Sequence, residues 1–425
     1  MQKSMGRFLT AAIVLAFGGL HGFGGGKQEL PKPVPPKLVK PWRDAGADAW
    51  WTHVNFQQEV FMGSFGIVLK DKNDMGKGSP GELPVFRFSQ WKDGVVPKLP
   101  DPGVPFAVEA TLATISDASL KDLAGLKSLR WLNLYGTEVT GVGFKDLTEL
   151  KDLQLLMLGQ TKVNDEGLKE VGRLTSLQTL ILSDTKITDA GMKDLAKIKN
   201  LKTLYFNETS LSDKGMKELA GLQNLEVLGL WGTKVTDAGL KDVTGFKKLR
   251  LLCLSNLPVT NMGLKAVAEC QNLEELYLSG TNVTDDGMKT LTGLKKLRWL
   301  DLGATKVTDA GLKGLAGMNL IYLMDIPDQA KTDLGLKHYI AALDPKGTFN
   351  LRLEGWKITD AGLKELTVLK NLGGVDLTGT AVTDAGLKEL AKLNGLLFLT
   401  LTKTKVTDAG VKALQKELPK CEITR

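Results

Sequence analysis

The chain has few of the side chains on which most enzyme and metal sites depend. Three histidines and three cysteines occur in 425 residues, and they are widely separated: His21, His53, His338, Cys253, Cys270 and Cys421. No spacing among them resembles a zinc site, and none of the histidines belongs to a convincing Ser-His-Asp set. An odd and low number of cysteines also argues against a disulfide framework. We therefore expect no catalytic residue, no cofactor and no bound metal.

Long hydrophobic runs are also scarce, and the clearest one lies at the N-terminus. Lys3 and Arg7 precede apolar residues from Phe8 to Leu20. This run is too short to span a membrane comfortably, so residues 1–25 are predicted to be a signal peptide or an uncleaved N-terminal anchor. The protein is accordingly expected to be exported, with a periplasmic, cell-surface or secreted location. Contact with a membrane is expected only through such an anchor.

A strong excess of one charge is absent as well. The net charge of +7 is spread along the chain, so we expect no nucleic-acid partner. The Pro- and Lys-rich residues 26–42 are predicted to form an extended linker. Residues 43–104 hold apolar pieces separated by turn-forming residues, and they are predicted to form a small strand-containing cap on the domain that follows.

Repetition dominates the remainder of the chain. The phrase "VTDAGL" occurs at residues 235–240, 307–312 and 382–387. Equivalents of its Asp recur every 24 residues, with a single step of 27: Asp117, Gly141, Asp165, Asp189, Asp213, Asp237, Asn261, Asp285, Asp309, Asp333, Asp360, Asp384 and Asp408. A fixed period in this range is typical of a solenoid, in which each repeat packs on its neighbours. Because a catalytic site needs one copy of its residues, so many copies indicate scaffolding.

The phrase has the properties of a helix start. In the copy at 235–240, Thr236 is predicted to cap a short helix with its hydroxyl, and Asp237 to face the positive end of the helix dipole. Val235 and Leu240 then form a hydrophobic staple. Each repeat also contains Leu-x-x-Leu-x-Leu, as in residues 225–230, whose last two leucines point to the same side of a strand. One strand and one short helix are therefore expected in every repeat.

A threonine follows the last of these leucines by three positions in nine repeats: Thr137, Thr161, Thr185, Thr209, Thr233, Thr281, Thr305, Thr380 and Thr404. We expect these hydroxyls to be buried and to bond the backbone of the neighbouring repeat, because amide groups leave the sheet at this point.

The pattern L-x-x-L-x-L-x-x-T-x-V-T-D-x-G-L resembles a leucine-rich repeat. It is similar to the subtype with "TDxGLxxL" helices in F-box and ribonuclease-inhibitor-like proteins, with Thr where many members have Asn or Cys. The resemblance covers residues 105–425, or about 13 repeats. It implies an α/β fold, a right-handed solenoid with parallel strands on the concave face and short helices on the convex face. The family implies a binding surface and leaves the partner open.

Large side chains at strand positions of the predicted concave face are candidates for partner binding, because Trp, Tyr and Arg are enriched at interface hot spots. These candidates are Trp131, Tyr135, Tyr205, Trp231, Arg250, Tyr277, Arg298 and Trp299, and Met157 and Arg352 have the same predicted exposure. The alternative is that the aromatic side chains only pack against one another across the sheet.

The repeat pattern becomes irregular between residues 318 and 356. There the recurring Thr is replaced by Gln329 and Trp356, and a three-residue insertion falls near residues 343–348. The lysine at the fourth position after the repeat's Asp is mostly followed by an acidic residue, but four consecutive copies lack this neighbour: Lys265, Lys289, Lys313 and Lys337. We predict a basic helix side that is a second contact site, for an acidic partner surface or for self-association. Simple decay of one repeat is the alternative.

These observations favour a non-enzymatic recognition scaffold that binds a protein or glycan partner on the concave face. The identity of the partner and the oligomeric state stay open. An alternative is an intracellular substrate adaptor of a ubiquitin ligase, like the F-box proteins with leucine-rich repeats, although no F-box-like helical segment is evident in residues 43–104. A third interpretation places an enzyme site in the same residues.

Overall fold

The computed structural model describes residues 34–53 and 82–425. The chain divides into two compact units at Leu177 and Gln178, and each unit is treated by itself below. The predicted export segment, residues 1–25, lies outside the described residues. Among the residues that are described, no helix is both long and apolar enough to cross a membrane.

The first unit has a five-stranded sheet in its described part. Its strands are β1 (Ala47–His53), β2 (Glu82–Phe88), β3 (Phe106–Glu109), β4 (Leu129–Asn133) and β5 (Leu155–Met157). Strand β1 is antiparallel to β2, and β2 to β5 are parallel. The helices are α1 (Pro36–Asp44), α3 (Asp117–Leu120) and α4 (Asp165–Val171), with short 3-10 segments between them. Strands β1 and β2 lie within residues 43–104, and the role of this segment as a cap stays a prediction.

Helix α1 covers residues that the sequence predicts to be an extended linker, and this part of the prediction is wrong. Pro36 stands in the first turn, where a missing N–H costs no helix bond. Val39 and Trp42 are buried. The Trp42 ring stacks on Phe86 with centroids 4.3 Å apart, and its Nε1 donates to the Pro100 carbonyl at 3.0 Å. Packing of this one indole fixes a segment whose composition is typical of a linker.

The second unit contains two parallel sheets. The first has strands β6 (Thr179–Ile181), β7 (Thr203–Tyr205), β8 (Val227–Gly229), β9 (Leu251–Cys253), β10 (Glu275–Tyr277), β11 (Trp299–Asp301) and β12 (Tyr322–Met324). The second has β13 (Phe349–Arg352), β14 (Leu372–Asp376), β15 (Phe398–Thr400) and β16 (Glu422–Thr424). The pairing of strands stops between β12 and β13, so this unit has two sheets and not one.

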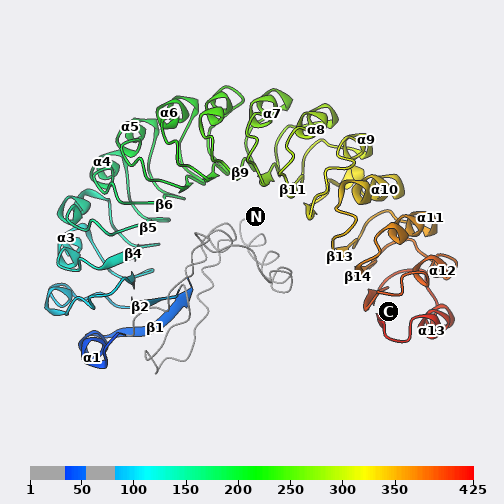
Figure 1. Ribbon diagram of the computed structural model, residues 1–425, viewed down its shortest axis with the longest axis horizontal. Coiled ribbons are helices and arrows are strands. Elements are labelled where there is room, and N and C mark those ends of the chain that lie inside the picture. The colour runs from blue at the N-terminus through cyan, green and yellow to red at the C-terminus, as the bar shows by residue number, and fades with distance from the viewer. Residues whose placement is uncertain (1–33, 54–81) are drawn as a thin grey trace. The chain divides into compact units, whose positions relative to one another are not determined.

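Short helices connect the strands of this unit. They are α5 (Met192–Leu195), α6 (Asp213–Leu219), α7 (Asn261–Val267), α8 (Asp285–Leu291), α9 (Asp309–Lys313), α10 (Asp333–Ala342), α11 (Asp360–Leu363), α12 (Leu387–Leu390) and α13 (Asp408–Glu417). Within this unit the strands lie on the inner side of a curve and the helices on its outer side (Figure 1). Parallel strands are about 4.8 Å apart whereas packed helices need about 8–10 Å, so stacking one of each per repeat produces this curvature. The predicted α/β solenoid is confirmed.

The repeat leucines form the core, as predicted: Leu225, Leu228 and Leu230 are fully buried. The recurring threonines bond differently from the prediction. The Thr233 hydroxyl donates to the Leu230 carbonyl of its own repeat at 2.8 Å, and all nine threonines make the equivalent bond three residues back. All of them except Thr404 are buried. The hydroxyls therefore stabilise the turn within each repeat and do not join neighbouring repeats.

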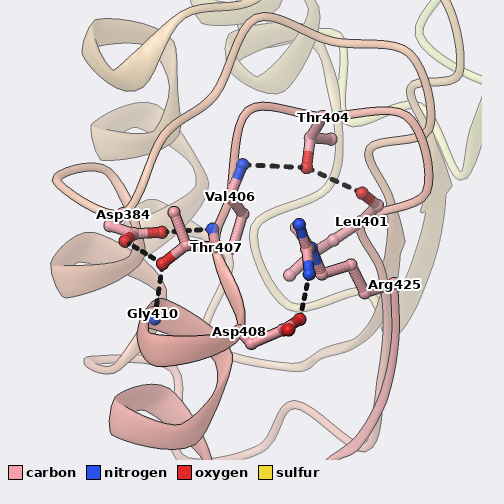
Figure 2. Close-up of polar contacts among 8 residues, drawn as sticks. All are labelled: Asp384, Leu401, Thr404, Val406, Thr407, Asp408, Gly410 and Arg425. Carbon is pink, nitrogen blue, oxygen red and sulfur yellow. Dashed lines mark hydrogen bonds and ion pairs between the residues drawn. The ribbon is translucent and has the colours of Figure 1, made fainter.

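The Asp of the repeated phrase supplies the connection between repeats. Thr407 donates its N–H and its hydroxyl to the carboxylate of Asp384 in the preceding repeat, at 2.7 and 2.6 Å (Figure 2). The same double contact recurs at Asp117, Asp189, Asp213, Asp237, Asp285, Asp333 and Asp360. At Asp408, in the last described repeat, the carboxylate instead pairs with Arg425 (Figure 2). We call this series of contacts the Asp–Thr ladder.

The glycine of the phrase belongs to the same ladder. A Cβ placed on Gly311 would lie 2.4 Å from the Asp285 Oδ1 of the preceding repeat, closer than any side chain tolerates. Thr, Asp and Gly of one short phrase are thus all explained by contacts between successive repeats.

The irregular region differs in its helix and its turn. Helix α10 has 10 residues, whereas α6, α7 and α8 have 7 each, so the extra length of this repeat lies partly in its helix. Gln329 replaces the recurring Thr, and its Nε2 donates to the carbonyls of Thr305 and Val307 in the preceding repeat, both at 2.8 Å. Unlike the threonine that it replaces, Gln329 does connect two repeats.

Candidate binding surface

The candidate surface is formed by side chains of β7–β12 that point away from the leucine core; we call it the strand face. Trp231 lies two residues after the end of β8 and is 37 % exposed, and Trp299 of β11 is half-buried. Tyr205 and Tyr277, however, are buried. The predicted exposure is therefore wrong for these two tyrosines, and their proposed partner contact stays a prediction.

The burial of Tyr205 has a local cause. The next strand carries Gly229 opposite Tyr205, and a Cβ there would lie 2.1 Å from the Tyr205 Cδ1. The tyrosine ring thus lies over the glycine backbone of β8 instead of pointing into solvent. This is the cross-strand packing that the sequence left as the alternative.

Two candidates belong to the first unit. Trp131 on β4 is buried, which contradicts its predicted exposure, and Tyr135 just after β4 is half-buried. Met157 on β5 is buried as well. The eight residues predicted to bind a partner are therefore not shown to form one site.

An aromatic pair on the strand face was not predicted from the sequence. The rings of Trp299 and Tyr322 lie with centroids 4.3 Å apart on the adjacent strands β11 and β12. The register pairs Trp299 with Tyr322, 23 residues later, whereas Glu275 pairs with Trp299 across 24 residues. The signal was present as a one-residue deletion in the loop before β12, which moves Tyr322 into this position.

Arg250 is the best-anchored guanidinium of the strand face. Its Nε and Nη2 donate to the two oxygens of Glu274 at 3.0 and 2.7 Å, in a bidentate pair between adjacent repeats. This contact holds the pKa of Arg250 above its ordinary value. Arg352, by contrast, is exposed on β13 and pairs with Glu354 two residues away.

Burial perturbs several acids in the middle of the strand face. It raises the pKa of Asp301 to about 7, although the Gly303 N–H donates to this carboxyl at 2.9 Å and favours its charged form. It raises the pKa of the Cys253 thiol to about 11, and it also raises the pKa of Glu275. The Tyr277 hydroxyl donates to Glu275 at 3.0 Å. These side chains form a largely buried group of acids on the strand face. With a pKa near 7, the Asp301 carboxyl is only partly charged at neutral pH.

The helix side carries the second predicted site. Lys265, Lys289, Lys313 and Lys337 are exposed on α7, α8, α9 and α10. Within the described part of the chain, no carboxylate lies within ion-pairing distance of any of them. One uncompensated ammonium per helix, on four successive helices, agrees with the predicted basic character of this side. We call these four residues the lysine row, and its role in contact stays a prediction.

Comparison with known families agrees with the repeat architecture. A family model described as "Leucine-rich repeat region" matches residues 108–243, and one described as "Leucine Rich repeat" matches residues 269–291. The chain is a leucine-rich repeat protein. Such proteins commonly bind protein partners, and their fold is typically a non-enzymatic scaffold.

Two of the solved structures that are similar to this leucine-rich repeat protein are bacterial. An internalin from Listeria monocytogenes is 19 % identical, with 70 % of this chain and 81 % of that chain covered and a TM-score of 0.42. A leucine-rich repeat protein of Leptospira interrogans is 20 % identical, with 80 % and 93 % covered and a TM-score of 0.46. A search of curated proteins found no match.

Proposed function

We propose that the protein is an exported recognition scaffold that binds a protein partner on the strand face of its second unit. The observation that carries this proposal is the set of large, partly exposed side chains along β8–β12, namely Trp231, Trp299, Arg298 and Ile321. Trp and Arg are the residues most enriched at binding hot spots, and an accessible Trp on a rigid sheet loses little entropy on binding. The proposal that the protein is exported rests on the residue pattern of its N-terminus. Sequencing of the mature N-terminus tests whether residues 1–25 are removed.

Replacing Trp231 and Trp299 together with Ala is expected to weaken partner capture at least about tenfold, because each truncation removes a hot-spot contact of about 1–2 kcal/mol or more. The measurement is quantitative mass spectrometry of proteins retained from an extract of the source cells. Thermal unfolding of the variant should change little, since neither side chain is fully buried.

Leu334→Ala is the matched control. Leu334 is exposed on α10, on the helix side, so its loss removes apolar surface away from the strand face. Partners retained equally by the control and by the double tryptophan variant would contradict the proposal.

The lysine row supports a second contact, with an acidic surface. Reversing the charge of Lys289, Lys313 and Lys337 to Glu should reduce an association that weakens with salt, because exposed charges act through screened attraction. Sedimentation velocity at low and high salt measures it. The control reverses Lys193, Lys217 and Lys241, which occupy the same helix position but are followed by Asp194, Glu218 and Asp242. Equal effects of the two triple variants, or no association at low salt, would leave the row without a binding role.

A further inference from the structure

Arg298 can be compared with Arg250, because the two arginines have equivalent positions in their repeats. Arg298 stands 48 residues after Arg250 and has the same backbone role: its carbonyl accepts from the N–H groups of Ile321 and Tyr322, at 2.9 and 3.1 Å. The Arg250 carbonyl accepts from Glu274 and Glu275 in the same way, at 2.8 and 2.9 Å. Ile321 therefore occupies, relative to Arg298, the position that Glu274 occupies relative to Arg250.

Because Ile321 stands where a glutamate would be equivalent to Glu274, the Arg298 guanidinium has no carboxylate from that position. Its Nη1 donates to the carbonyls of Lys295 and Leu297 at 3.1 and 2.9 Å, which fixes the plane of the group. Its Nε and Nη2, the two donors that Arg250 uses for Glu274, have no partner among the described residues. A guanidinium stays charged at any relevant pH, so this half-buried fork is ready for a bidentate acceptor.

Arg298 also lines a small pocket. It has a volume of about 150 Å³, and its lining includes Thr292, Lys295, Arg298, Gly317 and Asn319. None of the residues that line it is acidic, and two are cationic. Pockets for drug-sized ligands have about 300–1,000 Å³, so this one suits a single functional group of a larger partner.

The surroundings indicate what kind of partner carries that group. Ile321 is 37 % exposed, and the Trp299–Tyr322 pair begins the two strands that directly follow Arg298 and Ile321. A small acidic group with an apolar neighbour matches this arrangement better than a free inorganic anion, which would leave the exposed part of Ile321 in water.

We propose that Arg298, supported by Lys295, is a subsite for an Asp or Glu carboxylate of a protein partner, flanked by an apolar residue of that partner. The partner supplies in trans the carboxylate that Glu274 supplies to Arg250 in cis. This inference rests on the proposed function, since it assigns one contact within the strand-face interface.

The test follows the side-chain Nε–H signals of ¹⁵N-arginine-labelled protein while a capped tetraglutamate peptide is added. The Arg298 signal is identified by its loss in Arg298→Gln. It is expected to shift in a saturable way, whereas the Arg250 signal, already paired with Glu274, stays in place. An Arg298 signal that does not move would overturn the proposal.

Two substitutions of Ile321 sharpen the test. Ile321→Glu places a carboxylate where Glu274 stands relative to Arg250, so the Arg298 signal should begin near the paired position and tetraglutamate should bind at least about tenfold more weakly. Ile321→Gln, which has the same size and no charge, should respond like the unmodified protein. Equal titration of both variants would overturn the proposal.

Inorganic phosphate is the competing probe. Phosphate binding about tenfold tighter than tetraglutamate would overturn the assignment to a carboxylate. The two proposals can fail separately. If the double tryptophan variant captures partners normally, the proposed function is contradicted but the Arg298 titration can still succeed. If the Arg298 signal does not shift, this inference is contradicted but the tryptophan result still stands.

Discussion

Asp301→Asn is expected to make the protein more stable than the unmodified chain at pH 8, and about equally stable at pH 4. Asp301 is 8 % exposed on β11, and burial raises the pKa of its carboxyl to about 7. The nearby Asp325 acts in the same direction, whereas the bond from the Gly303 N–H opposes the shift. Asparagine keeps an oxygen for that N–H and carries no charge at any pH.

The sign follows from proton binding. Below the unfolded pKa of about 3.9, both states hold the proton, and the neutral carboxyl contributes its full stability. As pH rises from there, the unfolded state releases its proton while the folded state keeps it, so the stability falls, and the loss is complete above the folded pKa of about 7. About three pKa units at 1.36 kcal/mol each set an upper limit of about 4 kcal/mol for the gain from asparagine at pH 8. Urea unfolding of both proteins at the two pH values measures it.

Asp286→Asn is the control for general charge effects, because Asp286 is exposed on α8. It should change the free energy of unfolding by well under 1 kcal/mol at either pH. A pH-independent difference between the Asp301 variant and the unmodified protein would show that the folded carboxyl titrates like an unfolded one.

The fold followed from the sequence because its signal is repeated. Each 24-residue period places leucines at the same strand positions, so an error in one repeat is corrected by the others, and Leu228 and its equivalents are buried as predicted. A change that occurs in only one repeat, or outside the repeats, is not corrected in this way. The deletion before β12 moved Tyr322 beside Trp299, and one buried indole, Trp42, turned a predicted linker into a helix.

The binding surface was predicted less well, because exposure depends on the neighbouring strand. Tyr205 and Trp231 both read as accessible aromatics, but the first lies over Gly229 whereas the second extends beyond the end of β8. The sequence alone also did not reveal that Nε and Nη2 of Arg298 lack the carboxylate that Arg250 has. Recognising it requires the register that places Ile321 where Glu274 would otherwise stand.

The contacts of the Asp–Thr ladder were not predicted from the sequence, which assigned the Asp only an interaction with the helix dipole. The motif at 283–288, with its sequence "VTDDGM", separates the two explanations, because Asp285 and Asp286 both lie in the first turn of α8. Asp285 accepts from the Thr308 N–H and from the Thr308 hydroxyl, both at 2.7 Å. Asp286 is exposed, and it makes no such contact with any described residue of the neighbouring repeats.

Asp285→Ala is therefore expected to lower the free energy of unfolding by about 2–3 kcal/mol, because it removes two charge-assisted hydrogen bonds and leaves the Thr308 donors unpaired. Asp286→Ala should cost about 0.3–1 kcal/mol, the size of the dipole effect alone. Asp285→Asn should retain most of the stability. The natural Asn261 already accepts from the Thr284 N–H at 3.0 Å and donates to its hydroxyl at 2.7 Å. Denaturant unfolding of the three variants decides the matter: similar losses for the two alanine variants would mean that the carboxylate acts only on its own helix and that the ladder adds nothing between repeats.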